Sequence, residues 1–222
     1  MNTIQRRCFA VALGLGLLYL LLLPLKPYAL SWLLKPLPML VFAVLCWRAF
    51  PGAVGRWLAL GYVAAAAGDF FLDFGERDGL FIQALLSFLV NQIAFAAGFF
   101  LLARPACGSL RWRSLPALLY AALLAVWMVP AAGALQVPVA LYLGCLLLMV
   151  LMACRVEARP GPLWLGALLF MLADSLIGLN KFVQPFPYAV EVIVTCYFSG
   201  QTLIAWGLLR LSNRERPGSA RD

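Results

Sequence analysis

The sequence predicts an all-α fold, an eight-transmembrane-helix bundle of a polytopic membrane protein, and three observations carry this prediction. Hydrophobic residues make up 64% of the chain and charged residues only 12%, against about 25% charged residues in soluble domains. The apolar residues fall into eight runs, each near the roughly 20 residues that cross a bilayer. Connections rich in Lys and Arg alternate along the chain with connections that have few of them. With 222 residues, we expect a single membrane-embedded domain over residues 1–222.

The predicted spans are apolar runs separated by Pro, Gly and charged residues, such as Pro51-Gly52 and Pro160-Gly161-Pro162. The first run ends at Pro24 without a small-residue cleavage pattern, so we interpret it as a span and not as a signal peptide. In order, the spans are approximately Cys8–Leu23, Leu30–Trp47, Trp57–Phe74, Leu80–Ala103, Leu115–Val129, Val137–Cys154, Leu163–Leu179 and Tyr188–Leu211.

The basic residues in the connections give the spans a direction, because cytoplasmic loops carry the excess of Lys and Arg. Thirteen lie on one side and three on the other, which predicts cytoplasmic termini and a multi-pass protein of the bacterial inner membrane. This spread over many loops also explains the net charge of +8 without a nucleic-acid partner. One side holds Arg6, Arg7, Arg48, Arg56, Arg104, Arg111, Arg113, Arg155, Arg159, Arg210, Arg214, Arg216 and Arg221, and the other holds Lys26, Arg77 and Lys181.

The chain has no His, which excludes Ser-His-Asp and Cys-His catalysis and the His-containing zinc sites. The six Cys residues form no CxxC pair, so we interpret them as reduced structural thiols. No metal and no other cofactor is expected.

Polar residues within spans are costly and usually face the bundle interior or a water-filled cavity. The third span carries Asp69 and Asp73, one helical turn apart, the seventh carries Asp174 and Asn180, and the second carries Lys35. The fourth and eighth spans add a larger set of uncharged and acidic groups: Gln83, Ser87, Asn91, Gln92, Glu191, Thr195, Tyr197, Ser199 and Gln201.

The third and seventh spans run in the same direction, so Asp69 and Asp174 are expected in the same half of the membrane. Asp69 lies roughly 18 Å along its helix from Trp57, and Lys35 lies at a similar level. We expect the two aspartates and Lys35 to form a coupled site with one carboxyl protonated. For Asp73 and Glu191, near the interface, snorkelling at a helix end is the alternative explanation.

A weak internal repeat pairs the two aspartates. Gly61 precedes Asp69 by eight residues, and Gly166 precedes Asp174 by eight. Each Asp lies in the third span of a four-span half, so two parallel four-helix halves are a candidate internal organisation.

Short motifs extend from the second to the eighth span: Lys35-Pro36-Leu37, Gly68-Asp69, Ser87-Phe88-Leu89, Pro138-Val139 with Tyr142 and Met149, Phe170, Ala173-Asp174-Ser175, Leu179-Asn180, Phe182, Tyr197 and Gly200-Gln201. In these motifs the sequence resembles the lysoplasmalogenase (YhhN-like) family of eight-span membrane enzymes. Where members usually have a His and, three residues later, a Tyr, this chain has Gln92 and Phe95. Either the family's chemistry rests on the carboxylates, or this member differs in activity or substrate.

The resemblance implies hydrolysis of the vinyl ether bond of lysoplasmalogens, with a lysophospholipid as substrate and membrane lipid as the surroundings. Protonation of a vinyl ether needs a carboxylic acid, and a second carboxylate stabilises the cation and orients water. The hypothesis assigns these catalytic roles to Asp69 and Asp174. The residues expected to bind substrate or position groups are Lys35, Asp73, Gln92, Asn180, Tyr197 and Gln201.

Three other functions fit intramembrane acids. A proton-coupled small-molecule or lipid transporter would show the same buried charges and a two-fold repeat. An intramembrane aspartyl protease is disfavoured, because the chain lacks the usual Tyr-Asp and Gly-x-Gly-Asp pair. A lipid-binding module without catalysis would tolerate Asp→Asn changes at both positions.

Overall fold

The structure is a computed structural model that describes residues 1–26, 28, 30–74, 79–104, 110–157 and 161–215, without the side chains of 110, 111 and 215. Within these ranges eight helices are long and apolar enough to cross a membrane, and no strand is present. The predicted all-α, eight-span fold is confirmed. Some residues used in the predictions lie outside the described ones: Arg77, Cys107, Arg159, Arg216 and Arg221.

The chain divides into two compact units, Met1–Gly98 with Ala205–Asp222, and Phe99–Ile204. The first contains most of α5 (Phe81–Leu102) and the end of α9 (Ala189–Glu215), and the second contains the beginning of α9. The single-domain organisation stays a prediction. The other helices of the first unit are α1 (Thr3–Leu22), η1 (Leu23–Leu25), α2 (Ser31–Leu34), α3 (Leu37–Ala49) and α4 (Gly52–Phe74); those of the second are α6 (Leu110–Ala131), η2 (Gly133–Leu135), α7 (Gln136–Val156), α8 (Pro162–Gly178) and η3 (Leu179–Val183).

Two terminal helices extend beyond the apolar runs that predicted them, α1 at its beginning and α9 at its end. Helix α1 begins at Thr3, before Cys8, because Asn2 caps it: the Asn2 side chain accepts from the Gln5 N–H at 2.8 Å, and the Gln5 side chain accepts from the Asn2 N–H at 3.0 Å. This reciprocal pair is a capping box. At the other end of the chain, α9 continues to Glu215. Apolar runs alone therefore miss the polar residues that continue a helix past the end of its span.

The second span is a broken helix and not the continuous one predicted. Helix α2 ends at Leu34 and α3 begins at Leu37, so Lys35 and Pro36 lie at the break. Pro36 has no N–H to donate, which removes a helical hydrogen bond here. The Lys35 N–H still bonds to the Ser31 carbonyl at 3.2 Å. Lys35 is thus held at an irregular point of the span.

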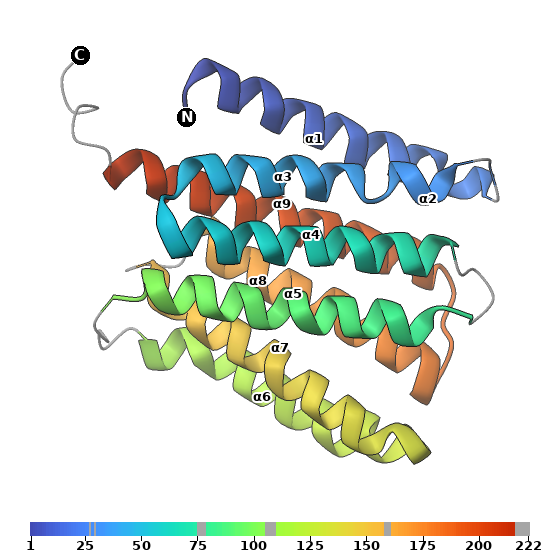
Figure 1. Ribbon diagram of the computed structural model, residues 1–222. Helices are drawn as coiled ribbons and strands as arrows, with labels where there is room; N and C mark the ends of the chain where they lie inside the picture. Colours follow the sequence, from blue (N-terminus) through green and yellow to red (C-terminus); the bar gives the residue numbers. More distant parts are fainter. Residues whose placement is uncertain (27, 29, 75–78, 105–109, 158–160, 216–222) are drawn as a thin grey trace. The chain divides into compact units, whose positions relative to one another are not determined.

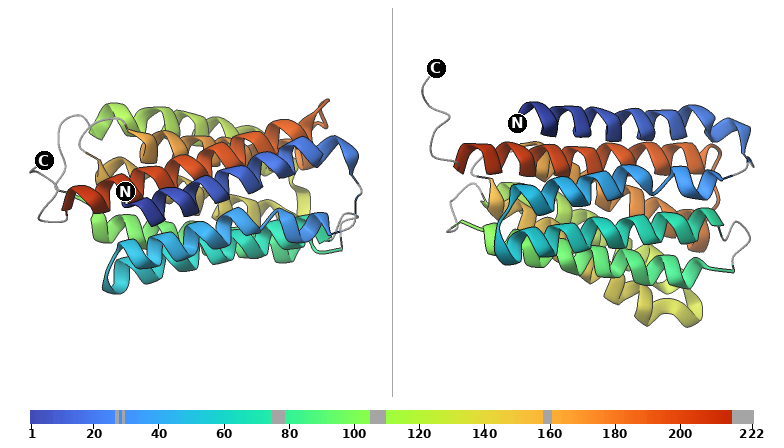
Figure 2. Two further views of the ribbon diagram at one scale, coloured as in Figure 1. Left: turned by 90° about the horizontal axis from the view of Figure 1, so that it is seen from above. Right: turned by 45° about the horizontal axis from the view of Figure 1, so that its top comes forward.

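Aromatic contacts hold the first unit together across four helices. The ring of Phe42 on α3 lies 5.6 Å from Phe9 on α1 and 5.5 Å from Tyr62 on α4, and Tyr62 lies 4.9 Å from Phe95 on α5. In Figures 1 and 2, α1, α3 and α4 accordingly run side by side. Phe95 is fully buried in this core.

In the second unit, α8 and α9 approach closely through two glycines. A Cβ atom on Gly166 would lie 2.6 Å from the Gly200 carbonyl oxygen, and one on Gly200 would lie 2.8 Å from the Phe170 nitrogen. Backbone atoms cannot move aside as flexible side chains can. Small residues at such crossings let membrane helices pack backbone to backbone.

We therefore expect Gly166→Ala to destabilise the protein by about 1–3 kcal/mol through overpacking. The measurement is thermal or SDS-induced unfolding of the purified protein in detergent. Gly144→Ala on α7 is the matched control, because no atom lies within 4 Å of its added Cβ, and it should be neutral or slightly stabilising. Equal stability of the two variants would contradict the close approach.

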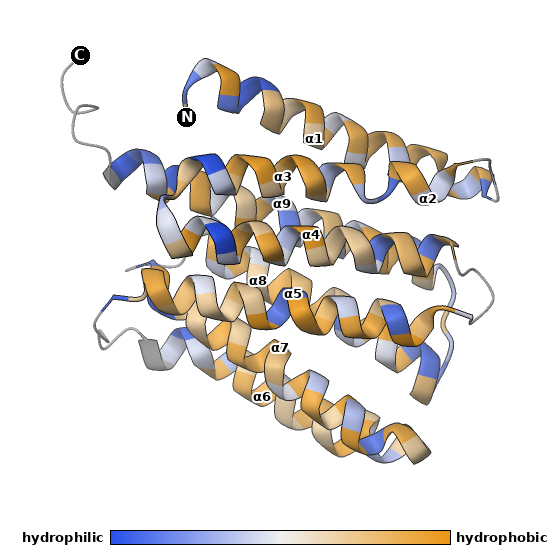
Figure 3. Ribbon diagram, viewed as in Figure 1, coloured by the Kyte–Doolittle hydropathy of each residue, from blue (hydrophilic) through white to orange (hydrophobic). Residues whose placement is uncertain are grey.

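Large apolar side chains are exposed on every candidate span; Trp127, Leu21 and Val137 are each more than 60% exposed. Figure 3 shows apolar colour along the helices, interrupted by hydrophilic bands. Such surface is suited to lipid and not to water. The candidate site residues lie on α4, α5, α8 and α9, in η3, and at the break between α2 and α3.

Candidate functional site

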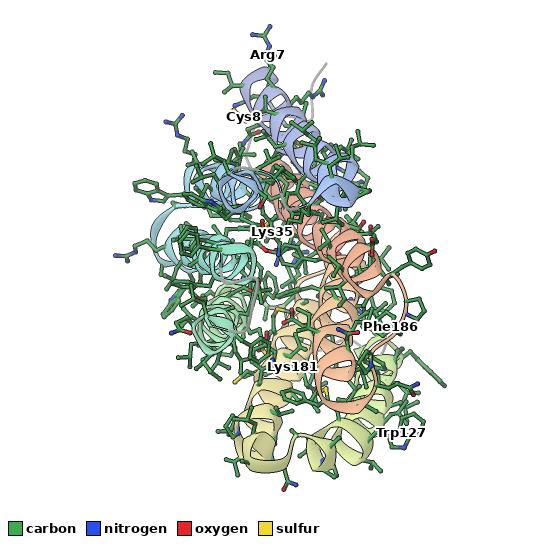
Figure 4. All side chains as sticks on the ribbon, turned by 90° about the vertical axis from the view of Figure 1, so that its right-hand side faces the viewer. Arg7, Cys8, Lys35, Trp127, Lys181 and Phe186 are labelled. Atoms are coloured by element: carbon green, nitrogen blue, oxygen red, sulfur yellow. The ribbon has the colours of Figure 1, made fainter. Side chains whose placement is uncertain are left out.

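Asp69 and Lys35 form a buried ion pair in the first unit. Lys35 Nζ lies 3.6 Å from Asp69 Oδ1, and the side chains are 8% and 1% exposed. Asp69 comes from the regular helix α4, and Lys35 from the break between α2 and α3. In Figure 4 the Lys35 side chain lies among the helices, whereas Arg7 projects away from the ribbon. Gly68, beside Asp69, packs against the ring of Phe88 on α5.

Asp73 lies one turn further along α4 and is buried, only 5% exposed, so it does not snorkel to solvent. Its Oδ1 atom accepts a hydrogen bond of 2.7 Å from the Tyr19 hydroxyl and forms an ion pair with Lys26. Lys26 also lies 5.5 Å from the centre of the Tyr19 ring. Burial and, after it, the charge of Asp73 raise the pKa of the Tyr28 hydroxyl. Tyr28 is therefore a further neighbour of this cluster.

Gln92, where the resemblance led us to expect a His, is fully buried on α5. Its neighbour Asn91 is also fully buried and donates from Nδ2 to the Gly61 carbonyl at 2.8 Å. Asn91 therefore joins α5 to α4 two turns before Asp69. Two buried amide side chains, Asn91 and Gln92, thus lie next to each other in the sequence of α5.

Asp174 is a buried carboxylate of the second unit and is 6% exposed. The Tyr142 hydroxyl on α7 donates to Asp174 Oδ2 at 2.6 Å. The ring of Tyr197 on α9 packs edge-on against Phe170, one turn before Asp174 on α8, with centroids 6.0 Å apart. Gln201, one turn beyond Tyr197, is fully buried. This carboxylate therefore lies beside a neutral phenol.

Asn180 lies in η3, a π-helical turn that follows α8 directly. Its Oδ1 atom accepts from the Phe186 N–H at 3.2 Å, which ties the turn to the loop that leads to α9. Figure 4 shows Lys181 and Phe186 in this region. π-helical turns often occur at functional sites. The observed contact of Asn180 orders the loop.

Asp69 belongs to the first unit and Asp174 to the second, so their expected meeting stays a prediction. Within units, the structure brings Lys35 to Asp69. In the part of the chain that the structure describes, no group of three Cys, Asp or Glu residues is arranged to hold a metal ion. Glu191 is exposed and Asp73 is buried. Exposure therefore fits snorkelling at a helix end for Glu191 and not for Asp73.

Three partners of the carboxylates were not among the predicted site residues: Tyr142, Tyr19 and Lys26. Tyr142 appeared only as part of a motif, and Lys26 only in the count of loop charges. Tyr19 is the one hydroxyl-bearing side chain in the first predicted span. A single Tyr in an apolar span is the signal that indicates such a partner in the sequence, because a buried hydroxyl needs a hydrogen-bond partner.

No curated protein and no solved structure matches the chain. The sequence model of the YhhN family matches residues 30–208, most of the chain. The match includes all eight predicted site residues, whereas Tyr19 and Lys26 precede it. Membership suggests a lysoplasmalogenase-like role. The chain belongs to the YhhN family, the family of lysoplasmalogenases.

Proposed function

We propose that the protein hydrolyses the vinyl ether bond of lysoplasmalogens and releases a fatty aldehyde and a glycerophospho-alcohol. The observation that carries the proposal is a pair of buried aspartates with different partners: Lys35 beside Asp69, and Tyr142 beside Asp174. With no His in the chain, these carboxyl groups are the leading candidates for proton transfer. Family membership supports the same reaction.

The reaction follows from vinyl ether chemistry. A carboxylic acid protonates the β-carbon, and the C=C electron pair forms the new C–H bond, leaving an oxocarbenium ion. Water adds to the α-carbon and gives up a proton to a carboxylate. The resulting hemiacetal loses the glycerol oxygen, which is protonated as it leaves, and the aldehyde forms. A positioned acid and base contribute typically about 10²–10⁴-fold each to such steps.

We assign the two roles from the partners. Asp69 forms an ion pair with Lys35, so it is the carboxylate that stabilises the cation and orients water. Asp174 accepts a hydrogen bond from the neutral Tyr142 hydroxyl, so it is the acid that delivers the proton. This division of labour resembles that of glycosidases. The proposal is that Asp69 and Asp174 act on one substrate.

The proposal includes the orientation of the chain in the membrane, the path of the lipid and the residues that contact it. Both termini face the cytoplasm, in a bacterial inner membrane, and the alkyl chain of the lysolipid enters between helices from the membrane. The residues that contact substrate or position water are Lys35, Asp73, Gln92, Tyr197 and Gln201, and Asn180 acts through the loop that it orders.

The test uses purified protein with a lysoplasmalogen and with its saturated-ether analogue, and measures aldehyde release. We expect release from the vinyl ether only, because a saturated ether cannot form the oxocarbenium ion by protonation at carbon. Absence of release from the vinyl ether, or equal release from both lipids, would overturn the proposal.

The broken second span favours one alternative. Discontinuous helices with a charged residue at the break are typical of substrate sites in transporters, and Lys35 lies at such a break. A transporter would accumulate ligand in proteoliposomes in response to a proton gradient and leave it chemically unchanged. The same purified protein can be used for both assays.

A further inference from the structure

The cluster of Lys26, Tyr19 and Asp73 has an incomplete set of hydrogen bonds. Asp73 Oδ1 receives both the Tyr19 hydroxyl and the Lys26 ammonium. Asp73 Oδ2 is buried and has no hydrogen-bond partner among the residues that the structure describes, and the same holds for the Tyr28 hydroxyl. Buried polar atoms are nearly always paired. One side of this carboxylate is therefore arranged to accept from something outside the described protein atoms.

The position of the cluster indicates which part of a lipid it would meet. Lys26 directly follows the first candidate span, Thr3–Leu25, and Asp73 is the penultimate residue of the span Gly52–Phe74. Both therefore lie where the apolar spans end, the level at which lipid headgroups begin. Lys26 is partly exposed, at 19% of its side chain. Asp69 lies one turn, about 6 Å, deeper along α4.

This order along α4 matches the order of groups in a lysoplasmalogen. The headgroup lies at the interface, the vinyl ether follows a few bonds below the phosphate, and the alkyl chain continues into the bilayer. A lipid with its headgroup beside Lys26 and Asp73 would thus bring its vinyl ether to the level of Asp69 and Lys35. The two ion pairs on α4 then serve two different parts of one substrate.

The charges and donors of the cluster define the headgroup chemistry. A Lys and an Asp side by side are the complement of a zwitterion that carries a phosphate and an ammonium. A carboxylate oxygen can only accept hydrogen bonds, and a primary ammonium offers three donors. A quaternary ammonium has no N–H to donate and a bare phosphate brings no cation, so neither offers Asp73 Oδ2 the charge-assisted hydrogen bond of a primary ammonium.

We propose that Lys26 and Asp73 form a headgroup subsite selective for phosphoethanolamine, in which Lys26 holds the phosphate and Asp73 Oδ2 accepts from the primary ammonium. This inference rests on the proposed function for the identity of the substrate, and it deepens that function by naming the headgroup. The Tyr19 hydroxyl donates to Oδ1, the other oxygen of the same carboxylate, and takes no part in the selectivity. Tyr19 and Lys26 precede the residues matched by the family model, and Asp73 lies within them.

The experiment measures binding of three non-cleavable saturated-ether lysolipids to the purified full-length protein. They carry phosphoethanolamine, phosphocholine and a bare phosphate. We expect the wild-type protein to bind the ethanolamine lipid about tenfold more tightly than the other two, as one charge-assisted hydrogen bond allows. Asp73→Asn should remove this preference. No preference in the wild-type protein would overturn the inference without any variant.

Two further variants separate recognition from structure. Tyr19→Phe removes a hydrogen bond to Oδ1 but keeps the carboxylate, so it should retain the preference. Glu191→Gln removes an exposed carboxylate on α9 and should also retain it. An equal loss of affinity for all three lipids in Asp73→Asn, or loss of the preference in Tyr19→Phe, would show a structural role and overturn the subsite.

The binding assay does not depend on catalysis, so the two proposals can fail separately. Ethanolamine preference in a protein that releases no aldehyde would contradict the proposed reaction and support the subsite. Aldehyde release at equal efficiency from vinyl ether lipids with all three headgroups would support the reaction and contradict the subsite.

Discussion

Replacing Asp174 by Asn is expected to lower kcat for aldehyde release from a lysoplasmalogen by about 100-fold or more, because a positioned general acid typically contributes about 10²–10⁴-fold. The amide keeps the size of the side chain and can still accept from Tyr142, but it cannot deliver a proton to carbon. KM should change little. Asp69→Asn should cause a loss of similar size, because the cation loses its carboxylate.

The controls distinguish lost chemistry from lost folding. Glu191→Gln makes the same chemical change at an exposed position and should keep wild-type activity. Tyr142→Phe removes the 2.6 Å hydrogen bond to Asp174 and should lower kcat by about tenfold with KM unchanged, as expected for a positioning residue. Full activity of Asp174→Asn in folded protein would exclude Asp174 as the acid.

The sequence alone was sufficient for the helices, because crossing a bilayer places a strong constraint on composition and length. All eight apolar runs correspond to candidate spans. The second and seventh differ in detail, since Lys35-Pro36 interrupts one and a π-helical turn, Leu179–Val183, extends the other. Both irregularities contain predicted site residues, Lys35 and Asn180. Functional polar residues and departures from regular helix occur together here.

The partners of the aspartates could not be predicted to the same degree. Spacing shows that Asp69 and Asp73 share a helix face, but which neighbouring helix supplies the facing side chain depends on helix rotation and packing. Tyr142, a lone phenol in an apolar run, bonds to Asp174, and Lys26, a loop residue in the sequence, bonds to Asp73. An isolated polar side chain has no periodicity that could indicate its partner.

Lys35→Met is expected to destabilise the protein by about 3–5 kcal/mol, because removal of one member of a buried ion pair takes a compensating charge from the other. Asp69 is 1% exposed, so water cannot take the place of the Lys35 ammonium beside it. The measurement is SDS-induced or thermal unfolding in detergent. Arg7→Met, which removes an exposed cation (Figure 4), should change stability by less than about 0.5 kcal/mol.

The double variant Lys35→Met with Asp69→Asn decides whether the loss comes from the unpaired charge. Replacing both members of a buried pair by neutral groups of similar volume is often nearly neutral, so the double variant should recover most of the stability lost in Lys35→Met. It should remain inactive, because the proposed carboxylate is gone. If Asp69→Asn alone leaves stability unchanged, a double variant as unstable as Lys35→Met would mean that the ion pair has no coupling energy. Lys35 would then stabilise the break in the second span by packing alone. Recovery of stability without recovery of aldehyde release would show that the folded protein needs at least one of the two charges for the chemistry. Asp69→Asn with Lys35 intact then shows whether that charge is the Asp69 carboxylate.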